Sequence, residues 1–153
     1  MRPRRSVTVN GRPLNAGVRG RMPGAMLRVG GSKAGVRAFL KITRMKPRRI
    51  YLRGEPTSPG SKILARANYF LVDVSSASGS HFPQQVQDAT RFMKRHLREL
   101  KSLRRHKLHA VVDFGVYDDR SEDAPMLSWR FPSKLMKLFS TAGIDGEVSI
   151  YDP

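Results

Sequence analysis

The sequence has no cysteine, few acidic residues in its first part and no long apolar run. Without cysteine, the chain cannot form disulfides, use thiolate metal ligands or attack a substrate with a thiol. No window reaches the about 18 consecutive apolar residues of a membrane-spanning helix, and Asp73 and Asp113 interrupt the most apolar stretches. These absences favour a soluble protein of a reducing compartment, and we expect a cytoplasmic location.

Acidic side chains are scarce over residues 1–110, which hold 25 of the 29 lysines and arginines but only 4 of the 12 aspartates and glutamates. The remaining residues hold 4 basic and 8 acidic side chains, and the whole chain has a formal net charge of +17. Such an imbalance indicates a nucleic acid, a protein partner with an acidic surface, or a basic leader that the fold does not need.

Residues 1–25 lack acidic and aromatic side chains and contain six arginines, three prolines and four glycines. They have too little apolar surface to offset the entropy lost on ordering, so we expect a disordered basic leader followed by a single domain over residues 26–153. The leader could follow phosphates or act as a targeting segment, or it could be an extension ahead of a start at Met22 or Met26.

Beyond residue 25, hydrophobic periodicity predicts strands alternating with helices. The expected strands are 26–29, 67–75, 110–117, 126–130 and 146–151, with 49–53 as a brief strand or an extended connection. A Gly30-Gly31 turn leads to a first helix, capped by Ser32, that has Thr43 on its apolar face and ends at Pro47. The other helices are expected over 83–104 and from Phe131 to Gly143.

Strands 110–117 and 126–130 are expected to form a hairpin around the acidic run at 118–123. One hairpin among alternating helices and strands favours an α+β fold. We therefore predict a two-layer sandwich that has a mixed or antiparallel sheet and about three helices.

Several segments carry a resemblance to a known family. They are 48–56 (Arg-Arg-Ile-Tyr-Leu-Arg-Gly-Glu-Pro), 71–74 (Leu-Val-Asp-Val), 84–86 (Gln-Gln-Val), 112–116 (Val-Asp-Phe-Gly-Val), Phe-Pro at 131–132 with Leu135, and 143–151 with its final Ser-Ile-Tyr. Over about residues 26–151 the chain resembles an uncharacterised bacterial family of small α+β, immunity-protein-like domains of unknown function. The resemblance implies a fold and an accessory or immunity-type role, and it implies no catalytic residue.

The helix expected over 83–104 provides the candidate binding site. Its apolar residues recur every three or four positions, and cations occupy the opposite face as one stripe that could follow a phosphate backbone or an acidic protein surface. The basic run 41–49 could lie nearby, although a solvated face is the more common state of such a stripe. Trp129 and the four tyrosines are not interleaved with these cations, so no RNA-stacking signature is expected. The candidate partner- or phosphate-binding residues are Arg91, Lys94, Arg95, Arg98, Lys101 and Arg105.

Other chemistry-bearing patterns are weaker. Residues 30–35 (Gly-Gly-Ser-Lys-Ala-Gly) fit neither the P-loop nor the dinucleotide spacing, which favours a capped turn. The carboxylates at 118–123 lack the spacing of a calcium loop. No cysteine or well-spaced carboxylate accompanies the histidines, and no nucleophile elbow occurs. No catalytic residue, metal or cofactor is predicted. The histidines are His81, His96, His106 and His109.

These patterns together favour a non-enzymatic, immunity-like domain that occludes a protein partner by binding its acidic surface, with the basic first part steering association. The alternative is a nonspecific nucleic-acid-binding accessory protein that uses the helix over 83–105.

Overall fold

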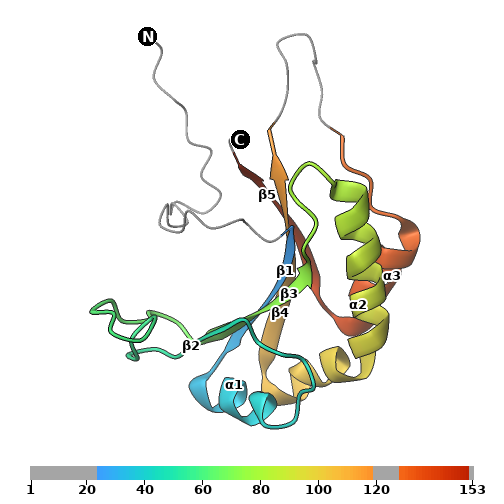
Figure 1. The fold of residues 1–153 in the computed structure, drawn as a ribbon. Coiled ribbons are helices and arrows are strands. Elements are labelled where there is room, and N and C mark those ends of the chain that lie inside the picture. The colour runs from blue at the N-terminus through green and yellow to red at the C-terminus, as the bar shows by residue number, and fades with distance from the viewer. Residues whose placement is uncertain (1–23, 119–127, 152–153) are drawn as a thin grey trace, which may run out of the picture.

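The computed structural model describes residues 24–118 and 128–151 (Figure 1). Within these ranges it has three α-helices, a short 3₁₀ helix and a five-stranded sheet, which confirms the predicted α+β class. In chain order the elements are β1 (Ala25–Gly31), α1 (Lys33–Leu40), β2 (Arg49–Tyr51), β3 (Tyr69–Ser75), α2 (Phe82–Ser102), the 3₁₀ helix η1 (Leu103–His106), β4 (Leu108–Tyr117), α3 (Ser133–Ala142) and β5 (Asp145–Tyr151).

The strands lie in the order β2-β3-β1-β4-β5. β1 lies at the centre and pairs antiparallel with both β3 and β4, so that Leu27 is opposite Val72 on one side and Val112 on the other. β2 extends the sheet antiparallel to β3, and β5 extends it parallel to β4. The sheet is therefore mixed, and its first four strands have the split β-α-β arrangement.

One face of the sheet is buried under helices. Alternate residues of the central strands, among them Leu27, Phe70 and Phe114, are fully buried and form one cluster with Met93 of α2 and Leu135 of α3. Figure 1 shows α2 and α3 side by side on this side of the sheet. None of the helices in the described ranges covers the opposite face, which we call the open face. It carries the intervening residues of each strand.

The predicted hairpin is wrong for the residues that the structure describes. Ser128, Trp129 and Arg130 are not in a strand, and Met126 lies outside the described residues. β4 already has β1 on one side and β5 on the other, so both of its edges are occupied. Periodicity reveals that a segment is apolar, but it does not reveal which strand takes a given edge.

The first helix is also shorter than predicted. Ser32 caps α1 as expected, because its hydroxyl accepts a hydrogen bond from the Gly35 amide at 3.0 Å. However, α1 ends at Leu40, so Thr43 lies beyond it. Gly30 and Gly31 belong to β1 instead of forming a turn.

The boundary of the predicted leader shifts slightly. β1 begins at Ala25, which is fully buried, one residue before the predicted start of the domain. Residues 1–23 of the predicted leader lie outside the described residues. In the described ranges, no helix is both long and apolar enough to span a bilayer.

Gln85, in the first turns of α2, connects this helix to the sheet by hydrogen bonds. Its side chain is fully buried, and its Nε2 donates hydrogen bonds to the carbonyl oxygens of Ser78 (2.9 Å) and Gly115 (2.8 Å). The Gly115 amide in turn donates to the Gly24 carbonyl at 2.8 Å. A buried amide that satisfies two backbone carbonyls fixes where α2 begins relative to β4.

Candidate anion-binding surface

Helix α2 displays the predicted stripe of cations. Val86, Ala89, Met93 and Leu100 form its buried face at steps that match a helical period, and Pro83 lies in the first turn, which tolerates the missing amide hydrogen. The stripe lies on the opposite face, and each of its residues is exposed. It comprises Arg91, Lys94, Arg95, Arg98 and Lys101, with Arg105 following in η1.

Carboxylates neutralise little of this stripe. Arg91 pairs with Asp88 one turn before it. For the other five cations, no carboxylate lies within ion-pair distance in the part of the chain that the structure describes. Like charges four residues apart, such as Lys94 and Arg98, destabilise a helix slightly. An anion bound along the stripe would relieve that repulsion.

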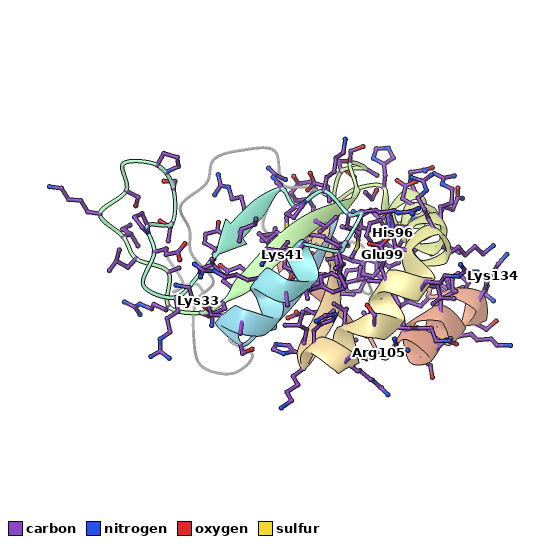
Figure 2. The ribbon with its side chains drawn as sticks, turned by 90° about the horizontal axis from the view of Figure 1, so that it is seen from below. Lys33, Lys41, His96, Glu99, Arg105 and Lys134 are labelled. Carbon is purple, nitrogen blue, oxygen red and sulfur yellow. The ribbon has the colours of Figure 1, made fainter. Side chains whose placement is uncertain are left out.

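Helix α3 adds further cations beside the stripe. Lys134, in the first turn of α3, lies against Lys94 of α2, and Lys137 is exposed one turn later. Lys134 lowers the pKa of the Lys94 ammonium, because a neighbouring cation disfavours the charged form. Figure 2 shows Lys134 on α3 and Arg105 on η1.

Arg104 of η1 completes this group. Gly143 ends α3 in the left-handed conformation, at φ 68° and ψ 44°, and a Cβ at this position would collide with the Arg104 guanidinium. The guanidinium therefore lies at the C-terminal end of α3, where the helix dipole favours a cation. We call the following residues the basic surface: Arg91, Lys94, Arg95, Arg98, Lys101, Arg104, Arg105, Lys134 and Lys137.

Glu99 links α2 to the connection between α1 and β2. Its Oε2 accepts hydrogen bonds from the Thr43 hydroxyl (2.6 Å) and the Arg44 amide (2.7 Å), and its Oε1 lies 3.0 Å from Nδ1 of His96. Burial alone would raise the pKa of Glu99, but the hydrogen bonds from Thr43, His96 and Arg44 outweigh burial and lower it. In Figure 2, His96 and Glu99 lie on the side of α2 that faces the end of α1, where Lys41 is labelled.

This link places part of the basic run 41–49. Arg44 lies beside α2, as expected, because its amide contacts Glu99. Arg48 and Arg49 lie farther on, at the edge of the open face, where Arg48 pairs with Asp73 at 3.2 Å and Arg49 donates to the Tyr51 hydroxyl at 3.3 Å. The run therefore leads from α2 to the open face.

In the 30–35 segment, close packing explains why residue 35 is a glycine. A Cβ on Gly35 would lie 2.5 Å from the carbonyl oxygen of His106, so glycine lets η1 approach α1 closely.

The histidines are spread over separate sites. His81 contacts the Ser78 hydroxyl, His96 contacts Glu99 and His106 lies edge-on to Phe39. Among the described residues, no group of three histidines and carboxylates could hold a metal ion. Of the acidic run, residues 119–123 lie outside the described residues, and Asp118 donates its amide to the Tyr151 carbonyl at 2.9 Å.

Sequence reasoning missed the contribution of α3 and of Arg104 in η1. Lys134 and Lys137 follow the polar periodicity of the predicted helix, so their exposure could have been inferred. The position of Lys134 beside Lys94 could not be inferred, because it depends on how α3 packs against α2. The interleaving of tyrosine and cations was misjudged as well, since Tyr51 lies between Arg49 and Arg53 in sequence and contacts Arg49 in space.

Comparisons of the chain with protein-family models, with curated proteins and with solved structures gave no match.

Proposed function

We propose that this protein binds nucleic acid without sequence specificity through the basic surface, and that this binding function is not catalytic. One observation carries the proposal: three elements place their cations on one exposed surface, and Arg91 alone among them has a carboxylate partner in the described ranges. At about 1.5 Å per residue, the stripe from Arg91 to Arg105 extends about 20 Å. A nucleic-acid strand places about six phosphates along that length.

The composition of the basic surface favours nucleic acid over an acidic protein. Protein interfaces usually have an apolar centre surrounded by polar residues. Among the described residues of α2, η1 and α3, Met136 is the only large apolar residue that is exposed, and it is 50% exposed. Such a surface has cations for phosphates but lacks the apolar centre that would hold a protein partner.

The test is binding of the full chain to labelled single-stranded and duplex DNA across a salt series. We expect the logarithm of the affinity to fall linearly with the logarithm of the salt concentration. Replacing Arg91, Arg95 and Arg98 together with glutamine should reduce that slope by about 2 to 3, because three phosphate contacts are lost.

The matched control removes three charges elsewhere. Lys33, Arg37 and Lys62 lie on α1 and on the connection between β2 and β3, and replacing them with glutamine should leave the slope nearly unchanged. Equal effects of the two triple variants would contradict the proposal, as would absence of binding at low salt. Binding to poly-glutamate but not to DNA would instead support the occlusion of an acidic, immunity-type protein partner.

A further inference from the structure

The open face of the sheet carries all four tyrosines of the chain. Side chains alternate between the two faces of each strand, and residues in register share a face. The register places Tyr51 of β2 opposite Tyr69 of β3, and Tyr117 of β4 opposite Tyr151 of β5. In both pairs, neighbouring strand residues such as Phe70 and Val116 point into the buried core. The tyrosines therefore form two cross-strand pairs at opposite ends of the open face.

The Tyr51–Tyr69 pair forms an aromatic platform. The ring centroids are 4.6 Å apart and the ring planes differ by 24°, so the two rings are stacked, and both side chains are only partly buried. The guanidinium of Arg49 donates to the Tyr51 hydroxyl at 3.3 Å. β2 is an edge strand of the described sheet, so no further strand of the described ranges lies beside Tyr51.

The two tyrosine pairs lie in different electrostatic surroundings. Arg49 and Arg53 flank Tyr51 in sequence, and no carboxylate pairs with either arginine among the described residues. By contrast, Asp113 and Glu147 lie opposite each other on the strands that carry Tyr117 and Tyr151, and Arg28 is already paired there with Glu147 at 3.0 Å. Phosphates would be attracted more strongly to the first pair than to the second.

A run of cations joins the Tyr51–Tyr69 pair to the basic surface. The Arg44 amide contacts Glu99 of α2, and four residues later the Arg48 amide donates to the carbonyl of Leu71 on β3 at 2.7 Å. The Arg48 side chain lies on the open face beside Asp73. The connection thus leads around the edge of the sheet from the helical side to the open face.

We propose that the Tyr51–Tyr69 pair stacks bases of a single-stranded nucleic acid whose backbone follows the cations from α2 around the edge strand β2. The proposal rests on the function proposed for the basic surface and specifies its ligand. A single strand can turn around an edge, whereas a duplex is stiff over about 150 base pairs. Stacking on aromatic rings is tolerant of sequence, because every base has a π-face.

The experiment compares two labelled strands of equal length and charge, oligothymidylate and a strand of abasic sites. Both present the same phosphates, but only the first presents bases. We expect the full chain to bind oligothymidylate roughly 5- to 100-fold more tightly for one stacked base. Replacing Tyr51 with alanine or leucine should abolish this preference without changing the affinity for the abasic strand. Tyr51→Phe, which keeps the ring, should retain the preference.

Tyr151→Ala is the matched control, since it removes an open-face tyrosine at the acidic end and should leave the preference intact. Urea unfolding of the Tyr51 variants checks separately that they are folded, because an unfolded chain with a net charge of +17 would also bind the abasic strand. Equal affinity of the unaltered chain for both strands would overturn the stacking proposal, as would a preference that survives both Tyr51→Ala and Tyr51→Leu. The proposed function fails separately, if the abasic strand does not bind at low salt.

Discussion

Among single residues, Glu99 is the clearest case of a side chain whose role depends on contacts distant in sequence. It is one of four acidic residues in the first 110, and it lies within the most basic helix of the chain. Its carboxylate does not neutralise the exposed cations. Instead it accepts two hydrogen bonds from Thr43 and Arg44, more than 50 residues away in sequence. Such bonds to an ionised group are stronger than bonds between neutral groups.

We expect Glu99→Gln to lower the free energy of unfolding at pH 7 by about 1 to 2 kcal/mol, through loss of charge-assisted hydrogen bonds. The lowered pKa of Glu99 sets how this difference in the free energy of unfolding depends on pH. Its stabilising contribution is complete above the ordinary pKa of 4.5 and is lost as the pH falls through the lowered value in the folded protein. Urea unfolding should therefore show the two proteins converging in acid.

Glu55→Gln is the comparison for this prediction. Glu55 also accepts hydrogen bonds, from Lys33 and Arg37, but it lies at the surface. Water screens such exposed ion pairs, so this substitution should have a smaller effect than Glu99→Gln. An equal or larger effect would show that the Glu99 bonds contribute nothing beyond a surface contact.

At the scale of elements, the packing of α3 against α2 brings cations together that lie about 40 residues apart in sequence. Lys134→Gln removes the like charge beside Lys94, and we expect the pKa of the Lys94 ammonium to rise toward its ordinary value of 10.5. NMR titration of the lysine side chains would measure the shift. Lys137→Gln, one turn along α3, should leave the pKa of Lys94 nearly unchanged. A similar shift in both variants would contradict the direct contact.

Local patterns predicted most elements but not their partners. The spacing of Val86, Ala89 and Met93 was enough to place α2, because a helix satisfies its backbone hydrogen bonds internally. A strand needs a neighbour, and sequence periodicity does not name that neighbour. For this reason β4 was paired with 126–130, although its outer edge is taken by β5, which returns after α3. The pairing of Tyr51 with Tyr69 was missed for the same reason.

For the molecule as a whole, we expect that part of the net positive charge can be removed without destabilising the hydrophobic core. The described ranges bury one continuous cluster that includes the start of β1 at Ala25. We expect deletion of residues 1–21, which removes six arginines, to change the free energy of unfolding by less than about 0.5 kcal/mol. Urea unfolding of both chains would measure this. A clearly less stable short chain would show that these residues contribute to the fold.

The same deletion separates the contribution of the arginines in residues 1–21 to DNA binding from the contribution of the basic surface. The short chain should bind DNA more weakly, because fewer cations face phosphates. However, its salt dependence should still respond to replacement of Arg91, Arg95 and Arg98, because these residues belong to α2. Loss of that response would place nucleic-acid binding in residues 1–21 alone.

Hydrogen bonds hold helix α2 in place near both ends. Gln85 donates to the backbone of β4 and of the loop before α2, and Glu99 accepts from the connection after α1. The charges of α2 therefore have fixed spacing before any ligand arrives, and only the outer parts of the lysine and arginine side chains lose freedom on binding. A pre-organised receptor loses less conformational entropy on association. Weakening either attachment should reduce affinity for a polyanion even though every cation remains in place.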